Sequence, residues 1–221
     1  MGKAALLFDL DGTMLHSDPI HIAVFADMMA ERGLTVDEAF YMTHFHGRLN
    51  EDIFAEFLPD EPDPKGLSVA KEAEFRRRLP RPYPAMPGLS ALVDRAEAEG
   101  WGLAVVTNAM RPNAEAMLEA IGLAGRIETV VIGGELARAK PDPLPYQIAM
   151  ETLGVAPDRA VAFEDSPSGL RAAHGSGAYT IGIRSSLEDG ELRAHGAQIT
   201  LKDFTDPALE PSLQRLKGVP A

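Results

Sequence analysis

The chain has 221 residues, of which 45% are hydrophobic and none is cysteine. This composition predicts a folded globular protein with room for one large domain, or for a core with a small appended domain. The absence of cysteine excludes disulfide bonds and cysteine-ligated zinc or iron–sulfur sites, and the formal net charge of −12 disfavours nucleic acid and anionic lipid headgroups as partners.

No apolar segment approaches the roughly 20 residues that a membrane-spanning helix needs. The first apolar stretch is too short for a secretory signal because Asp9 interrupts it. A chain without cysteine suits a reducing compartment. We therefore expect a cytoplasmic protein, and a monomer, whose partner is a small molecule rather than nucleic acid or a membrane.

The first predicted element is a buried strand at residues 4–8, an unbroken apolar run. Asp9, Asp11 and Gly12 follow where the strand ends, and the glycine permits a turn there. Ligands of parallel α/β sheets bind just beyond such strand ends, and two carboxylates there attract a divalent cation. With a metal bound, one carboxylate could attack as a nucleophile while its neighbour carries a proton. The alternative is an ordinary turn in which the aspartates bond only to the backbone.

After Thr13 the pattern becomes helical. Asp18 predicts the N-cap of a first helix, Thr35 with Glu38 forms a capping-box signature for a second, and Asn50 is a candidate N-cap for a third. The first, third and fourth predicted helices cover residues 20–32, 51–58 and 65–79, and the proline-rich segment 80–84 forms a stiff connector. The sequence thus predicts an all-helical insertion after the first strand.

From residue 86 onward, strands and helices alternate. The predicted strands cover 101–107, 129–132, 160–163 and 179–183, and the predicted helices cover 88–99, 111–121, 142–153 and 166–174. Such alternation indicates parallel βαβ units with helices on both faces of a sheet. The segment from Glu188 is less regular, and we expect one short edge strand at 197–201 and a final helix.

Polar residues stand at the ends of several of these strands. Asp9 and Asp11 follow the first, Thr107 and Asn108 follow another, and Glu164, Asp165 and Ser166 end a third, with Lys140 at the start of a helix between the last two. Each group alone could be a turn, a surface lysine or a helix cap. Together, in this order on a βαβ pattern, they predict one site at the carboxyl edge of the sheet.

The order Asp9-Leu10-Asp11-Gly12-Thr13, Thr107-Asn108, Lys140-Pro141 and Glu164-Asp165-Ser166 resembles the haloacid dehalogenase-like hydrolase superfamily. The resemblance extends from Leu6 to about Ile183 and is closest to phosphatases and phosphomutases with a helical cap between the first two motifs. It implies a Rossmann-like α/β core at 1–15 and 83–221 and a helical cap at 16–82. A finer similarity links the segments 16–21 and 106–114 to members that hydrolyse small sugar and polyol phosphates.

The resemblance also implies catalytic roles. Asp9 would be the nucleophile that forms an aspartyl-phosphate, and Asp11 the general acid and base. Mg²⁺ would be held by the Asp9 carboxylate, the Asp11 backbone carbonyl and Asp165. Glu164 would lie in the outer shell or bind the metal through water, unless it is only a helix-cap carboxylate.

The same resemblance assigns the phosphate contacts. Lys140 would neutralise both the phosphate and Asp9. The Thr107 hydroxyl and the Asn108 backbone N–H would hold phosphate oxygens. Thr13 would shape the first loop.

In the predicted cap, His21 matches a position that orients the acid/base aspartate, although a packing histidine is equally compatible with the pattern. Asn50 stands where related phosphomutases have an arginine that grips a second phosphate, with Arg48 nearby as an alternative; a neutral amide suits a sugar hydroxyl better. His44 and His46 could in principle form a zinc site, but a cap-lining role is favoured.

The sequence thus predicts a Mg²⁺-dependent phosphatase for small sugar or polyol phosphates. The alternative is a β-phosphoglucomutase-like hexose phosphomutase. Dehalogenase chemistry is disfavoured because it does not need Asp11, and phosphonoacetaldehyde hydrolysis because neither cap lysine, Lys65 or Lys71, lies in a recognisable motif. A non-enzymatic metal-binding or interaction module is disfavoured by the intact motif set.

Overall fold

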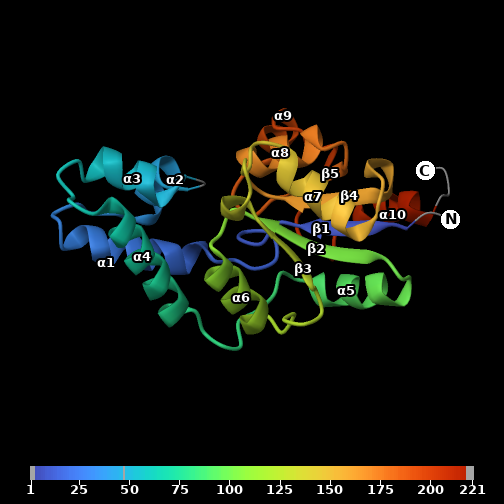
Figure 1. Cartoon of the computed structure of the whole chain (residues 1–221), viewed down its shortest axis with the longest axis horizontal. Helices are drawn as coiled ribbons and strands as arrows, with labels where there is room; N and C mark the ends of the chain where they lie inside the picture. Colours follow the sequence, from blue (N-terminus) through green and yellow to red (C-terminus); the bar gives the residue numbers. More distant parts are fainter. Residues whose placement is uncertain (1–2, 47, 218–221) are drawn as a thin grey trace. The chain divides into compact units, whose positions relative to one another are not determined.

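The computed structural model describes residues 3–46 and 48–217. The chain divides into two compact units, an α/β unit formed by Met1–His16 with Arg81–Ala221 and a helical unit formed by Ser17–Pro80 (Figure 1). Each unit has its own buried core. Within the described ranges, no helix combines the length and the apolar character that crossing a bilayer would require.

The α/β unit is built on a six-stranded sheet with the order β3-β2-β1-β4-β5-β6, in which all paired strands are parallel. The strands are β1 (Ala5–Phe8), β2 (Gly102–Thr107), β3 (Thr129–Ile132), β4 (Ala160–Glu164), β5 (Tyr179–Ile183) and β6 (Ile199–Leu201). This confirms the predicted α/β class. β1 lies between β2 and β4, so the strand order reverses beside it, which is where α/β sheets bind ligands.

The helices of this unit are α5 (Leu89–Ala98), α6 (Arg111–Ala120), α7 (Leu144–Leu153), α8 (Pro167–Gly175), α9 (Asp189–Ala194) and α10 (Leu209–Gln214). Figure 1 shows α5 and α7 on opposite sides of the central strands. α7 contacts β1, β2 and β3, and α8 contacts β4 and β5. A parallel sheet covered in this way explains why its strands read as continuous apolar runs.

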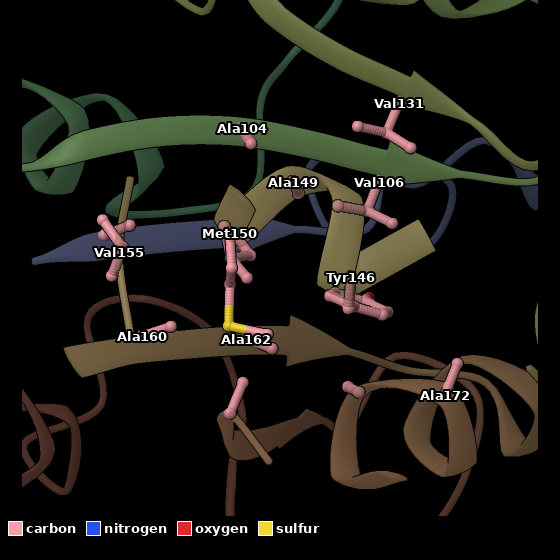
Figure 2. Packing of buried hydrophobic residues seen from close by; sticks show 14 residues of the cluster. Ala104, Val106, Val131, Tyr146, Ala149, Met150, Val155, Ala160, Ala162 and Ala172 are labelled. Carbon is pink, nitrogen blue, oxygen red and sulfur yellow. The ribbon is translucent and has the colours of Figure 1, made fainter. Parts of the chain in front are cut away.

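One face of the sheet packs small side chains against α7 and α8. Figure 2 shows Ala104, Val106 and Ala162 on the strands, with Met150 and Tyr146 of α7 packed against this face. The small residues let the helices approach closely, and the larger α7 side chains fill the space between layers. Tyr146 is among the largest fully buried side chains of the protein.

The opposite face carries an aromatic cluster beneath the site. Phe8 of β1 stacks on Phe163 of β4 with ring centroids 5.1 Å apart, and Phe204 meets both rings edge-on. Such contacts contribute about 0.5–1.5 kcal/mol each beyond area burial. They fix the ends of β1 and β4, from which two carboxylates of the site project.

Several predicted boundaries in the α/β unit need correction. α7 begins at Leu144 rather than at Asp142, because Asp142 accepts a hydrogen bond from the Leu144 N–H in the preceding turn. β6 covers only Ile199–Leu201 of the expected 197–201, and α9 was not predicted. α9 is short and has a capping box at Glu188 and Glu191, so its signal is local and easily read as a turn.

The helical unit contains α1 (Asp18–Ala30), α2 (Glu38–His44), α3 (Asn50–Phe57) and α4 (Pro64–Arg78). Its core is aromatic: Phe25 lies 4.8 Å from Phe45 and 6.1 Å from Phe54 between ring centroids. The helices are where the sequence predicts them, to within a few residues.

Three predicted caps of this unit are wrong. Ser17, not Asp18, precedes α1, and the Asp18 carboxylate instead accepts from the Tyr41 hydroxyl. α2 is capped by Asp37, whose side chain accepts from the Phe40 N–H, so the Thr35 capping box does not form its start. Asn50 is inside α3 rather than its cap, because its amide is used in side-chain contacts with α4.

Candidate active site

Strand register places two acidic side chains next to each other at the carboxyl end of the sheet. Phe8 of β1 pairs with Phe163 of β4, so Asp9 and Glu164, one residue further on, are also neighbours. The Asp9 N–H donates to the Phe163 carbonyl at 2.9 Å and extends the pairing to this point. Because side chains alternate along a strand, both carboxylates project to the face opposite the Phe8–Phe163 stack.

Lys140 joins these two carboxylates. Its Nζ donates to Asp9 Oδ1 and to Glu164 Oε1, at 2.5 Å each, and all three residues are buried. Burial alone would lower the pKa of the Lys140 ammonium, but the charges of Asp9 and Glu164 outweigh it and hold that pKa above its ordinary value. Lys140 is therefore a permanent positive charge beside Asp9.

Glu164 is held entirely by protein donors. Its Oε1 also accepts from the Tyr146 hydroxyl at 2.9 Å, and its Oε2 accepts from the Asp165 N–H, the Ser166 N–H and the Ser166 hydroxyl at 3.1–3.3 Å. A Cβ on Gly169 would lie 1.8 Å from Glu164 Oε1, so only glycine fits beneath this carboxylate. The carboxylate thus anchors the Lys140 ammonium. Ser166 also caps α8 through the Gly169 N–H.

Asp165 lies beside this pair and is fixed by two hydroxyl groups. Thr13 donates to Asp165 Oδ1 at 3.2 Å, and Ser185 donates to Asp165 Oδ2 at 2.8 Å. Gly12 has a φ of +74°, and a Cβ there would lie 2.0 Å from Asp165 Oδ2. The glycine after Asp11 is thus required twice, for the turn and for the close approach to Asp165.

The charge balance of this cluster suits a divalent cation. Asp9, Glu164 and Asp165 offer carboxylate oxygens within 4.8 Å of one another, and Lys140 is the ammonium that contacts this group. Burial and the neighbouring charge of Glu164 raise the pKa of the Asp9 carboxyl against the opposing pull of Lys140. Three carboxyl groups around one ammonium favour the binding of a further cation, and hard carboxylate oxygens are the ligands that Mg²⁺ prefers.

Thr107 is the last residue of β2, and Asn108, which follows it, contacts the Lys140 backbone. The Asn108 amide donates to the Lys140 carbonyl and accepts from the Lys140 N–H, both at 3.2 Å. Gly133 leaves room for it, since a Cβ there would lie 2.2 Å from Asn108 Oδ1. Thr107 is buried and its hydroxyl accepts from the Ala109 N–H at 3.0 Å, so its own O–H can donate to a ligand.

This architecture also matches that of known proteins. The family model described as haloacid dehalogenase-like hydrolase matches residues 6–183. The chain belongs to the haloacid dehalogenase-like hydrolase family. All four motif groups on which the sequence-based resemblance rests lie within the matched residues.

Relatives match this haloacid dehalogenase-like hydrolase over nearly its whole length. The validoxylamine A 7'-phosphate phosphatase of Streptomyces hygroscopicus subsp. limoneus is 30% identical and covers 96% of this chain and 100% of its own. The beta-phosphoglucomutase of Mycobacterium bovis is 30% identical over 91% of this chain and 90% of its own. A crystal structure of CbbY from Rhodobacter sphaeroides with phosphate superposes with a TM-score of 0.80 at 30% identity, covering 92% of this chain and 95% of that one. The chain is thus an enzyme of a hydrolase family whose named relatives include phosphatases.

The helical unit of this hydrolase contains a second, partly buried polar cluster. His21 Nδ1 and Lys71 Nζ are 2.8 Å apart, Lys71 donates to Glu72 Oε1 at 2.8 Å, and the Asn50 amide donates to the same oxygen at 2.7 Å. Burial raises the pKa of the Glu72 carboxyl, but the charge of Lys71 and the hydrogen bonds from Lys71 and Asn50 leave that pKa below its ordinary value. The predicted cap residues His21 and Asn50 therefore belong to one network.

Other residues of the helical unit lie outside that network. Arg48 forms an exposed ion pair with Glu56 at 2.7 Å, and Gly47 lies outside the described residues. His44 packs on Phe40 and Phe57, and His46 lies 3.8 Å from Asp18. In the described part of the chain, Asp9, Glu164 and Asp165 form a group of three side chains close enough to share a metal ion, and these histidines belong to no such group.

The sequence did not predict several of the polar residues that form these two clusters. Ser185 and Tyr146 contact the acidic cluster, and Lys71 and Glu72 complete the cluster in the helical unit. Ser185 had a usable signal, because it follows the end of β5 just as the recognised motifs follow β1, β2 and β4. Tyr146 had none, since an aromatic residue inside a helix is ordinarily a core residue.

Proposed function

We propose that the protein is a Mg²⁺-dependent phosphatase that hydrolyses small phosphate monoesters, sugar or polyol phosphates, through an aspartyl-phosphate on Asp9. The observation that carries the proposal is the buried Lys140 ammonium that joins Asp9 and Glu164 beside Asp165. A nucleophilic carboxylate next to a permanent cation and a metal-ligand set is what phosphoryl transfer requires.

In the first step, an Asp9 carboxylate oxygen attacks phosphorus, and the bond from phosphorus to the leaving oxygen breaks. Asp11 gives its proton to that oxygen, so the alcohol departs neutral. Lys140 neutralises the Asp9 carboxylate and the phosphoryl oxygens as they approach each other. The Thr107 hydroxyl and the Asn108 backbone N–H donate to the phosphoryl oxygens, while the Asn108 side chain holds the Lys140 backbone in place.

In the second step, Asp11 takes a proton from water, and the resulting hydroxide attacks the phosphorus of the aspartyl-phosphate. The bond between phosphorus and the Asp9 oxygen breaks, which regenerates the carboxylate and releases inorganic phosphate. Over the two steps, one phosphate ester and one water molecule are converted to one alcohol and one inorganic phosphate. Asp11 thus alternates between acid and base in one turnover.

Asp9, Asp165 and the Asp11 backbone carbonyl would hold Mg²⁺, with Glu164 in the outer shell. Bound there, the cation supplies Lewis-acid neutralisation of the phosphoryl oxygens. Glu164 then serves chiefly to keep Lys140 in position, because its own oxygens already accept from Lys140, Tyr146 and Ser166.

The proposed substrate class rests on the helical unit and on the relatives. We infer that this unit, Ser17–Pro80, acts as a cap that covers the substrate and excludes water during the first step. Asn50 stands where a phosphate-gripping arginine would be needed, and Arg48 is paired with Glu56. The Asn50 amide donates to Glu72 Oε1, and a neutral amide suits a hydroxyl group better than a second phosphate.

The second candidate is a hexose phosphomutase, favoured by the 30% identity with a beta-phosphoglucomutase. A mutase would interconvert sugar phosphates only with a bisphosphate primer and would release little inorganic phosphate. Because this chain has Asn50 where related phosphomutases have an arginine, mutase activity is the weaker of the two candidate functions.

The proposal is tested by phosphate release from a panel of sugar phosphates, glycerol phosphate, phosphoglycolate and nucleotides, with Mg²⁺ or with a chelator. We expect turnover of one or more sugar or polyol phosphates that falls to background when Mg²⁺ is removed and returns when it is restored. Metal-independent release, or primer-dependent isomerisation without release, would contradict the proposal.

A further inference from the structure

The loop that follows β5 reaches the acidic cluster from a strand end that no recognised motif occupies. β5 ends at Ile183, and Ser185 donates from its hydroxyl to Asp165 Oδ2 at 2.8 Å. The two residues are 20 positions apart in the chain. The contact is partly buried, so water competes for it less than on an open surface.

Ser185 completes the restraint on one carboxylate. Thr13 donates to the other Asp165 oxygen, Oδ1, at 3.2 Å, and the Gly12 backbone leaves no room for a side chain next to Oδ2. Each carboxylate oxygen is thus bound by one hydroxyl from a different segment of the chain. A carboxylate oxygen has two lone pairs, so it can accept a hydroxyl hydrogen bond and bind a cation at the same time.

A carboxylate that is fixed before the metal arrives loses less freedom on binding it. Outer-shell hydrogen bonds that orient a ligating carboxylate typically change metal affinity by about 10–100-fold. Without the Ser185 hydroxyl, Asp165 Oδ2 would lose this hydrogen bond, and the carboxylate would be held less firmly in its orientation toward Asp9. The loop after β5 would then influence the metal without touching it.

We propose that Ser185 is a positioning residue that orients Asp165 for a divalent cation. The inference rests on the proposed function, because it assumes the cation site at Asp9 and Asp165. The inference goes further than that function: the end of a fourth strand, β5, contributes to the site, and Ser185 acts through Asp165 rather than on the substrate.

The neighbouring residue offers a matched control. Ser186 lies in the same loop, and its Oγ is buried without a hydrogen-bond partner among the described residues. Replacing either serine by alanine removes the same atom from the same loop. Only the loss at Ser185 removes a contact with Asp165.

The test is titration of Mg²⁺ into the full-length protein by calorimetry, and of Mn²⁺ by electron paramagnetic resonance, for the wild type and three variants. Ser185→Ala should weaken cation binding by about tenfold or more, because the orienting hydrogen bond is lost. Ser185→Thr, which keeps a hydroxyl, should bind the cation more tightly than Ser185→Ala, and Ser186→Ala should match the wild type. Urea unfolding of each variant checks that the fold is unchanged.

Phosphate release gives an independent readout. Ser185→Ala should need more Mg²⁺ for half-maximal turnover, while its kcat at saturating Mg²⁺ returns close to the wild-type value. Unchanged cation affinity in Ser185→Ala, or equal weakening in Ser186→Ala, would overturn the inference and leave the proposed function intact. A wild-type protein that binds no Mg²⁺ would instead contradict the proposed function, and the inference with it.

Discussion

Asp9→Asn should lose turnover by at least about 10⁴-fold, because an amide of the same shape cannot attack phosphorus. The substitution keeps the volume of the side chain, and the Asp9 backbone N–H still pairs with the Phe163 carbonyl. Phosphate release from the best substrate at saturating Mg²⁺, measured for both proteins, gives the ratio directly.

The fold of Asp9→Asn should persist. Burial and the charge of Glu164 already disfavour the ionised Asp9 carboxyl, as its raised pKa indicates. Removing that charge therefore relieves repulsion within the cluster, and Lys140 keeps its contact with Glu164. The urea midpoint should stay near that of the wild type. A variant that keeps normal metal-dependent phosphate release would show that Asp9 is not the nucleophile.

Lys140→Met should damage both activity and stability. Methionine has a similar length but no charge, so Asp9 and Glu164 would remain buried without their shared cation. Removing one partner of a buried ion pair typically costs about 3–5 kcal/mol. We expect the free energy of unfolding to fall by that order, and phosphate release to fall to background because the phosphoryl charge is no longer neutralised.

Lys202→Met is the matched control, since Lys202 is an exposed lysine of the same unit. It should change stability by no more than about 0.5 kcal/mol. Added Mg²⁺ should restore part of the stability lost in Lys140→Met, because a cation that binds only the folded state stabilises it by mass action. If Lys140→Met and the wild type were equally stable in chelator, the Lys140 ammonium would not be stabilising the buried Asp9 and Glu164 carboxylates, and this part of the account would be wrong.

The parts of the site that the sequence predicted are those attached to strand ends. Asp9 follows β1, Thr107 ends β2 and Glu164 ends β4, and each strand is an apolar run whose end is visible in the sequence. Parallel pairing then places these ends at one edge of the sheet. The register that puts Asp9 beside Glu164 depends on the pairing of Phe8 with Phe163, which no local pattern specifies.

The missed residues are those whose partners are distant in the chain. Lys71 lies 50 positions from His21, and an isolated lysine in a helix is indistinguishable from a solvated one until the packing of α1 on α4 is known. Tyr146 has the sequence signature of a core residue, and only the packing of α7 on the sheet brings its hydroxyl to Glu164. The misplaced caps at Thr35 and Asn50 reflect competition from other hydrogen bonds in the folded unit.

The most direct test of the account is to trap the phosphoryl group on Asp9. In Asp11→Asn, 4-nitrophenyl phosphate should still phosphorylate the enzyme, because nitrophenolate leaves without a proton, but the water that completes the reaction lacks its base. Rapid mixing with Mg²⁺, acid quenching and peptide mass spectrometry should then find a burst of nitrophenol matched by phosphoryl transfer to the peptide that contains Asp9. A phosphoryl group on another residue, or nitrophenol release without any modified peptide, would contradict the account.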